Sequence, residues 1–393
     1  MFKPARVLQV ATVFAFFLGG CASTKPAAKA SPDTSAHMPL ASANQPTTTA
    51  STANAASIKA GSSTNSVEGF LTGSGQLKPD IQAYAHEVAQ TRKIPLAQVE
   101  SLLKAAQYNA TVAKLMAPSK TRIRRSWITY RNRFVEPVRI KAGVTFWQQN
   151  RSVLDKVSAQ YGVPPSIIVA IIGVETIYGR NTGTFRVLDA LATLGFRHPD
   201  IARPERSQLF RDQLADLIEL DHRKELDARQ VTGSFAGAIG LPQFMPGSLL
   251  RYAVDGDNDK HIDLRGNPDD AIASVANFLR MHGWQPGLPV FAPVTLPDNA
   301  SKLVVGGLEP TYEWTQLKAK GAKAHAGVTQ MPWQNHRVGV VDLLDEPRKL
   351  EEYRTGTPNF FAITHYNRSY FYAASVADLA QALAQQMGSG GPN

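Results

Sequence analysis

The sequence predicts a mainly helical (α+β) protein with one small β-containing element. Apolar residues recur at helical spacing over most of the chain from residue 79 onward. Short stretches rich in branched and aromatic residues occur only late, between about residues 288 and 365. With 393 residues, 43% of them hydrophobic, the chain can bury a sizeable core without disulfides or metal ions. We expect folded sequence over residues 67–388.

The expected elements follow in order along this part of the chain. Ile81, Tyr84, Ala85 and Val88 share one helical face, and a second such pattern begins after Pro95, which suits a helix N-terminus. Further helical patterns fit 143–161, 165–178, 206–222, 269–282 and 375–387. The β-like stretches are Phe291–Leu296, Leu303–Val305, Val338–Leu343 and Phe360–Thr364.

The first 66 residues have the composition of a signal peptide followed by a tether. Lys3 and Arg6 precede an apolar run that is too short to cross a bilayer, so residues 1–20 are typical of a signal peptide. Over residues 22–66, 28 of 45 are Ser, Thr or Ala and none is aromatic. Such a segment cannot bury enough apolar surface to offset the entropy of ordering it, which indicates a flexible tether over 21–66.

Cys21 directly follows the predicted signal peptide and is the only cysteine in the sequence. With a single cysteine, neither an intramolecular disulfide nor a thiolate metal site can form. The sequence Leu18-Gly19-Gly20-Cys21 resembles the lipid-attachment site of bacterial lipoproteins. Ala22 follows the cysteine, which in similar lipoproteins favours the periplasmic face of the outer membrane. The alternative is an ordinary secretory signal with a chance cysteine.

The charge balance favours an anionic partner. The formal net charge is +10. Export makes nucleic acid an improbable partner and an acidic polymer such as a cell wall the better one. The basic stretch 120–141 has Trp127, Tyr130 and Phe134 interleaved. It indicates either a solvated helical face with core aromatics or the wall of a cleft in which aromatic rings stack on sugars.

The strongest catalytic candidate is Glu175. Eight apolar or glycine residues, 167–174, precede it after Pro164, Pro165 and a capping Ser166. A helix that is apolar on all sides belongs inside a protein. Burial would raise the pKa of Glu175 and keep it protonated as a general acid. The alternatives are an ion pair with Arg180 or Arg186, or a place at the solvent end of the helix.

Residues 233–248 predict a binding loop. Four glycines and two prolines specify a tight backbone. Gln243 in this loop carries a neutral amide that can both donate and accept hydrogen bonds, which suits hydroxyl or N-acetyl groups.

Long motifs in these segments resemble the membrane-bound lytic murein transglycosylase B family. They are IIGVETIYGR around Glu175, LDALATLGF at 188–196, GSFAGAIGLPQFMPGS at 233–248, DAIASVANFLRMHGW at 270–284 and ITHYNRSYFYA at 363–373. The resemblance implies a lysozyme-like catalytic core over about 143–285, a flanking helical domain and a β-containing element over about 288–365. It also implies an enzyme that cleaves the β-1,4 bond between N-acetylmuramic acid and N-acetylglucosamine without water. The product is a 1,6-anhydromuramoyl end.

The resemblance also assigns site residues. Glu175 matches the single acid/base, and Ser234 and Gln243 match residues that contact the sugar and its N-acetyl group. The other substrate-binding positions are Tyr130, Phe244, Phe278, Tyr366, Asn367 and Tyr372. The family often has Tyr at Phe278, and segment 200–208 is longer than usual, so Arg203 and Arg206 match no sugar-binding arginine. Without the resemblance, Tyr366, Tyr370 and Tyr372 alternate as on a strand and would be explained as core residues.

A third motif indicates a metal site. Asp255, Asp257 and Asp259 stand at alternate positions of a turn, where carboxylates converge on a hard cation. The resemblance implies structural calcium, with the His261 carbonyl and Asp270, or Asp269, completing the site. The alternative is a solvated acidic turn, since Lys260 adds an opposing charge. No cofactor is expected for catalysis.

Two other functions stay open. A hydrolytic muramidase would need a second carboxylate to activate water. A non-catalytic lipoprotein could tether the membrane to peptidoglycan, although the intact Glu175 segment argues against it. The expected partners are peptidoglycan strands and, through the lipid, a membrane; the protein is expected to be a monomer that binds no nucleic acid.

Overall fold

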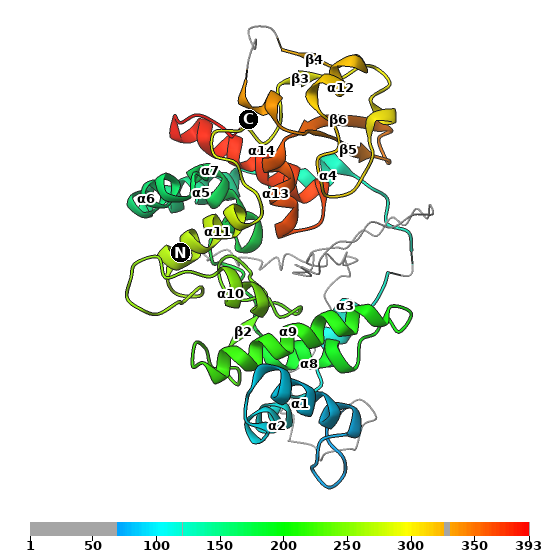
Figure 1. The fold of residues 1–393 in the computed structure, drawn as a ribbon, viewed down its shortest axis with the longest axis vertical. Coiled ribbons are helices and arrows are strands. Elements are labelled where there is room, and N and C mark those ends of the chain that lie inside the picture. Colours follow the sequence, from blue (N-terminus) through cyan, green and yellow to red (C-terminus); the bar gives the residue numbers. More distant parts are fainter. Residues whose placement is uncertain (1–68, 120, 326–330, 393) are drawn as a thin grey trace, which may run out of the picture.

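The computed structural model describes residues 69–119, 121–325 and 331–392. The predicted signal peptide, Cys21 and the tether lie outside these residues. The described part is mostly helical, with three two-stranded antiparallel sheets (Figure 1). The predicted fold class is confirmed, while the predicted domain limits stay predictions. Within the described ranges, no single helix is both long and apolar enough to cross a bilayer; the helices Arg151–Tyr161 and Pro165–Thr176 qualify only as a pair, which bends by 114°.

The N-terminal helices of the described part pack against two helices from the middle of the sequence. α1 (Pro79–Arg92), α2 (Leu96–Ala105) and α3 (Ala110–Met116) share an apolar cluster with α8 (Val187–Phe196) and α9 (Pro204–His222). In Figure 1 the blue α1 and α2 lie below the green α8 and α9. Arg92 joins the two layers through Asp216 at 2.6 Å and Glu219 at 2.5 Å.

A second cluster surrounds α7 (Pro165–Thr176). Its helices are α4 (Trp127–Arg131), α5 (Pro137–Gln149), α6 (Arg151–Tyr161), α10 (Pro246–Tyr252), α11 (Pro268–Met281), α13 (Pro358–Tyr366) and α14 (Tyr370–Met387). α14, near the C-terminus, packs directly on α7. The short strands β1 (Phe185–Arg186) and β2 (Thr232–Gly233) pair antiparallel, and β1 leads directly into α8.

The third cluster is the β-containing element. β5 (Gly339–Asp345) and β6 (Leu350–Gly356) form an antiparallel hairpin in which Gly339 faces Gly356. β3 (Val294–Thr295) pairs with β4 (Lys323–Ala324), and α12 (Trp314–Ala319) and the 3₁₀ turns η1 (Ala300–Leu303) and η2 (Pro332–Asn335) complete it. The core of this element surrounds the buried Trp333.

Several expected elements differ from the structure. The single helix predicted over 143–161 is two helices that meet at Asn150. The strand predicted at 303–305 is wrong, because a 3₁₀ turn ends at Leu303 there. The strand predicted at 360–364 is also wrong: Thr357 caps a helix at that point by accepting the Asn359 N–H, and Pro358 opens it. Buried helices and buried strands give the same continuous apolar run, so composition alone could not separate them.

The tyrosines predicted to alternate along a strand therefore lie on helices. Tyr366 ends α13, and Tyr370 and Tyr372 stand in the first turn of α14. Ser369 caps α14 by accepting the Tyr372 N–H, so the helix begins at Tyr370, five residues before the predicted start at 375.

The basic stretch 120–141 is mainly structural in its first half. Arg122 pairs with Glu346 at 3.1 Å, Arg125 with Asp342 at 2.7 Å and Arg131 with Asp378 at 2.5 Å. These contacts dock the segment around α4 on the β5–β6 hairpin and on α14. The interleaved Trp127 and Phe134 are buried, in agreement with the core-aromatic interpretation.

Candidate active site

α7 carries Glu175 into the interior on a rigid support. Every residue from Ser166 to Thr176 is buried. The nearly fully buried Arg139 of α5 donates its Nε–H to the Gly173 carbonyl at 3.0 Å, near the C-terminal end of the helix. The Thr176 hydroxyl donates to the Leu241 carbonyl at 3.0 Å and so joins α7 to the loop that carries Gln243. A cation near the last carbonyls also suits the negative end of the helix dipole.

The chain leaves α7 through two consecutive left-handed residues, Ile177 (φ 51°) and Tyr178 (φ 58°). This turn folds the Tyr178 ring back between α5 and α7, where it stacks on Phe146 at 5.4 Å. A Cβ at Gly143 or at Gly173 would overlap the Tyr178 hydroxyl. The two glycines therefore make room for a ring that fixes the C-terminal end of α7, at the cost of backbone strain.

The two carboxyl oxygens of Glu175 differ in their hydrogen bonding. The Tyr372 hydroxyl donates to its Oε1 at 2.6 Å. Its Oε2 is buried and accepts no hydrogen bond from any residue in the described ranges. Burial raises the pKa of Glu175 to about 8, and the Tyr372 bond opposes that rise in part. The carboxyl is therefore protonated near neutral pH.

The predicted alternatives for Glu175 do not hold. The side chain is only 6% exposed, so it is not at a solvent end. Arg186 instead holds Asp189 at 2.5 Å and the Ala105 carbonyl at 2.7 Å. Within the described part of the chain, Glu175 forms no ion pair.

Tyrosines surround the carboxyl. Tyr366 stacks parallel to Tyr372, with ring centroids 6.3 Å apart, and donates its hydroxyl to the Pro242 carbonyl at 2.5 Å. Tyr130 of α4 is half-buried and packs edge-on against Phe371. Burial and then the charge of Glu175 raise the pKa of Tyr130, Tyr366 and Tyr372. The three side chains are therefore neutral hydroxyl donors.

Gln243 lies in a loop whose backbone is fixed on both sides. Ile239 and Phe244 exchange backbone hydrogen bonds of 2.8 and 3.0 Å, and the Leu241 N–H donates to the Leu264 carbonyl at 2.7 Å. Gln243 itself is left-handed (φ 51°), and its Nε2 donates to the carbonyls of Gly240 and Thr182 at 2.9 and 3.2 Å. Since both donors are used, the amide oxygen is the group left to accept from a ligand.

Ser234 and Asn367 are the other two predicted polar residues of the site. The Ser234 Oγ accepts the Ala238 N–H at 3.0 Å, which leaves its own proton to donate. Asn367 follows α13 with its side chain mostly buried.

Phe244 and Phe278 are placed differently from the prediction. Both are completely buried, and they pack against each other and against Tyr366 with ring centroids 4.9–5.9 Å apart. Neither side chain is exposed in this structure, so their contact with a substrate stays a prediction. They form an apolar layer beneath the tyrosines. Phe278 also stacks on His282 at 3.9 Å, so no tyrosine hydroxyl is needed for its packing.

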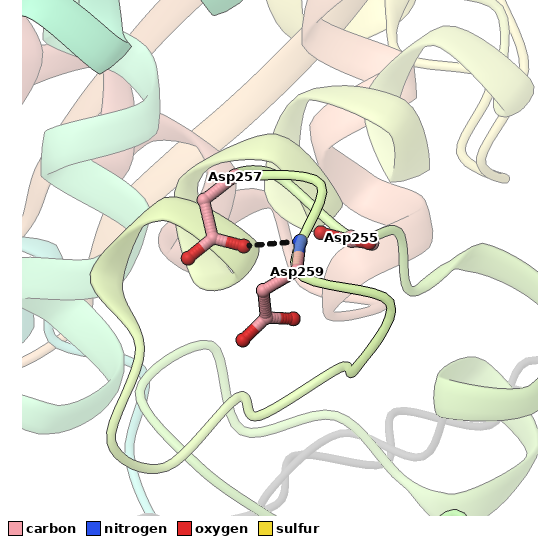
Figure 2. A group of neighbouring side chains, drawn as sticks. All are labelled: Asp255, Asp257 and Asp259. Carbon is pink, nitrogen blue, oxygen red and sulfur yellow. Dashed lines mark hydrogen bonds between the residues drawn. The ribbon is translucent and has the colours of Figure 1, made fainter.

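The acidic loop brings three of its predicted ligands together. Carboxylate oxygens of Asp255, Asp257 and Asp259 lie within 4.8 Å of one another (Figure 2). Asp270 does not join this group. It is fully buried, and its two oxygens accept the N–H groups of Gly256 and Asp263, each at 2.7 Å. Asp270 thus braces the loop from inside, while the His261 side chain is exposed.

Three supporting residues escaped sequence analysis: Arg139, Thr176 and Tyr178. The glycine inside the apolar run at Gly173 was a signal, since glycine in a helix often marks a close approach. The sequence does not reveal that Tyr178 is the ring that approaches it.

Comparison with models of known protein families identifies the family of this chain. The model described as "Transglycosylase SLT domain" matches residues 76–381, which is more than half of the chain. The chain belongs to this transglycosylase family. Its relatives include the membrane-bound lytic murein transglycosylase B of Escherichia coli (strain K12). That protein is 37% identical over 316 residues, which are 78% of this chain and 83% of the relative.

Solved structures of similar transglycosylases have the same fold. The soluble lytic transglycosylase SltB1 of Pseudomonas aeruginosa has 37% identity and a TM-score of 0.70, over 79% of this transglycosylase and all of SltB1. Escherichia coli Slt35 in complex with calcium has 35% identity and a TM-score of 0.67, over 79% and 94% of the two chains. Pseudomonas aeruginosa SltB3 in complex with NAG-anhNAM-pentapeptide has 27% identity and a TM-score of 0.65, over 80% of each chain. The lysozyme-like, mainly helical architecture is thereby confirmed.

Proposed function

We propose that this protein is a peptidoglycan lytic transglycosylase in which Glu175 acts first as acid and then as base. The observation that carries the proposal is the buried, protonated Glu175 with a free Oε2. Its pKa is set by burial and the Tyr372 hydroxyl, not by a second carboxylate in the described ranges. The name of the Escherichia coli relative and the anhydro-sugar complex of SltB3 support the same substrate and product.

The chemistry needs only one carboxyl. Oε2 gives its proton to the glycosidic oxygen, and the bond from that oxygen to C1 of N-acetylmuramic acid breaks. The N-acetyl oxygen of the same sugar stabilises the positive charge at C1. The sugar's own C6 oxygen then bonds to C1, and the Glu175 carboxylate takes the proton that this hydroxyl loses. An attacking group held in place in the same molecule outcompetes water by proximity.

The neighbours of Glu175 have roles in this scheme. The Tyr372 bond to Oε1 stabilises the carboxylate formed after proton transfer and keeps Oε2 toward the substrate. The amide oxygen of Gln243 accepts the N–H of the N-acetyl group, and the Ser234 hydroxyl donates to a sugar oxygen. Tyr130 is the most exposed tyrosine of the site and offers a ring face to the glycan.

The products of digested sacculi test this function. Mass spectrometry should show muropeptides one water lighter than those released by a hydrolase. Reducing N-acetylmuramic acid ends would instead identify a hydrolytic muramidase. Intact sacculi that bind the protein without release of fragments would favour the wall-tethering alternative.

We further propose attachment to the membrane through a lipid on Cys21, with the tether 22–66 giving reach toward the wall. A flexible chain of about 45 residues has a root-mean-square span of roughly 35–40 Å. The membrane-bound name of the Escherichia coli relative supports a periplasmic, membrane-associated enzyme. Cys21→Ala should move the protein from the membrane fraction to the soluble fraction, and unchanged fractionation would contradict the anchor.

The acidic loop is proposed to hold a structural calcium ion through Asp255, Asp257 and Asp259, with the His261 carbonyl as a further ligand. The convergence of three carboxylates and the calcium complex of Slt35 support this. Asp270 would stabilise the site through its hydrogen bonds to the loop backbone. It could bind the ion itself only after its side chain moved away from those bonds. The loop follows α10, so the ion would brace the segment behind Gln243 and take no part in the chemistry.

Calcium should raise the melting temperature of protein stripped with a chelator, because a ligand of the native state stabilises it by mass action. Asp257→Ala should abolish the rise. Asp298→Ala removes an exposed carboxylate far along the chain and should leave the rise intact. An unchanged melting temperature at saturating calcium would rule out a site of useful affinity.

A further inference from the structure

The helix α4 is too short to hold its own position. It has five residues, and isolated helices of this length are not stable in water. It nevertheless carries Tyr130, the half-buried tyrosine whose ring is proposed to meet the glycan. Burial and the nearby charge of Glu175 raise the pKa of Tyr130, so the two side chains belong to one site. Contacts with other elements must therefore fix the place of α4.

One carboxylate of α14 binds the C-terminal end of α4. Arg131, the last residue of α4 and the neighbour of Tyr130, donates its Nε–H to the Oδ2 of Asp378 at 2.5 Å. The Asp378 side chain is only 10% exposed, and it also accepts two N–H groups of Arg354 from β6, at 2.6 and 3.3 Å. Asp378 thus holds two guanidinium groups where water hardly reaches, and charged hydrogen bonds are screened least in such a place.

The first residue of α4 is connected to the same carboxylate. The indole N–H of Trp127 donates to Glu352 at 2.8 Å, and Glu352 also accepts the Nε–H of Arg354 at 2.5 Å. The guanidinium of Arg354 lies 5.6 Å from the centre of the Trp127 ring, within range of a cation–π contact. Both ends of α4 are therefore linked to Asp378, one directly and one through Glu352 and Arg354.

The face of α14 that carries Asp378 also packs against Tyr130. Phe371 stands seven residues before Asp378, so the two side chains share one face of the helix. The Phe371 ring lies 5.6 Å from the Tyr130 ring. The adjacent residue, Tyr372, donates to Glu175. α14 thus presents a hydroxyl to the acid and, on a neighbouring face, holds the helix that carries Tyr130.

We propose that Asp378 is a positioning residue for the glycan: it sets the place of the Tyr130 ring relative to Glu175. The inference rests on the proposed function, in which Tyr130 contacts the glycan. Asp345 of the β5–β6 hairpin accepts the Ile128 N–H at 3.0 Å and anchors the opposite end of α4 independently. Loss of the Asp378 charge should therefore release the end beside Tyr130 and leave the rest of the fold in place.

Asp378→Asn tests the proposal, because the amide keeps the shape of the side chain and removes its charge. On glycan strands freed of their peptides by an amidase, KM should rise about tenfold, which corresponds to one lost contact of about 1.4 kcal/mol. The value of kcat should stay within about twofold, since the contact is made equally in the ground state and the transition state.

Asp216→Asn is the matched control. Asp216 is also buried and also holds two arginines, Arg92 of α1 at 2.6 Å and Arg251 of α10 at 3.5 Å. Its substitution should lower the melting temperature and leave KM unchanged. A rise in KM as large as that of Asp378→Asn would mean that general loss of stability, and not the place of α4, weakens glycan binding.

A double-mutant cycle shows whether Asp378 acts through Tyr130. The affinity for the same glycan strands is measured in the Glu175→Gln protein, with Tyr130→Ala, with Asp378→Asn and with both. The double variant should bind no more weakly than Tyr130→Ala alone, because the two changes remove one contact. Additive losses would overturn the positioning role, and so would a fall in kcat at unchanged KM in the Asp378→Asn enzyme.

A second variant covers the case in which Asp378→Asn does not fold. Arg131→Gln removes the contact with α4 and leaves the pair of Asp378 with Arg354 intact. It should raise KM to the same extent, and an unchanged KM would contradict the proposal. The cycle measures binding and does not depend on catalysis. Wild-type protein that releases only reducing ends would overturn the proposed function, while the cycle would still decide the role of Asp378.

Discussion

Glu175→Gln should lower the release of muropeptides from sacculi by at least about 10²–10⁴-fold, the usual contribution of general acid–base catalysis. The amide has the size of the carboxyl and can still meet the Tyr372 hydroxyl through its oxygen. It has no proton to give to the leaving oxygen and cannot take one from the C6 hydroxyl. Both half-steps should be lost together, whereas the glycan contacts proposed for Gln243 and Tyr130 should remain.

Initial rates and sacculus pull-down measure the two effects separately. The variant should bind sacculi as the wild type does and release almost nothing. Glu313→Gln, an exposed position at the start of α12, is the matched control and should keep full activity. If Glu175→Gln retained more than a tenth of the rate, another group would be the acid and the assignment would be wrong.

The same substitution should stabilise the protein more and more as the pH rises. The pKa of Glu175 is about 8 in the folded protein, against 4.5 for an ordinary glutamate. Between these values the unfolded chain has lost a proton that the folded chain keeps, so the free energy of unfolding of the wild type falls as the pH increases. Because Gln does not titrate, the variant does not lose this stability as the pH rises. The stability difference should be small near pH 4.5 and reach the order of a few kcal/mol by pH 8.

Melting curves of the two proteins from pH 5 to pH 9 provide the measurement. The gap between their melting temperatures should widen up to about pH 8 and then stay constant. A gap that does not change with pH would mean that Glu175 is ionised and solvated in the folded protein, which contradicts the acid role.

The catalytic helix could be predicted from the sequence because its signal is local. Pro165, the unbroken apolar run and the carboxylate at its end specify a buried helix and a desolvated Glu175 within a dozen residues. The helix α13 was missed because its apolar run fits a buried strand equally well, and the Thr357–Pro358 start was the only local sign to the contrary.

The residues that surround Glu175 could not be predicted from local sequence patterns. Tyr372 was predicted as a site residue only from the resemblance to the transglycosylase family. The spacing of residues does not show that its hydroxyl bonds to the Oε1 of Glu175. Phe244 and Phe278 were expected at the substrate because they lie in matching motifs, yet packing places them below the tyrosines.

The bond between Tyr372 and Glu175 joins residues 197 positions apart. Synthesis proceeds from the N-terminus, so α7 emerges long before α14, and closing so large a loop is a slow step in folding. Until α14 docks, the face of α7 that packs on α14 is uncovered, and Glu175 lacks the Tyr372 donor and part of its apolar surroundings. A nascent or truncated chain that lacks α14 should consequently have no activity. Under the proposed function, an enzyme that cuts the cell's own wall would become active only once α14 is in place.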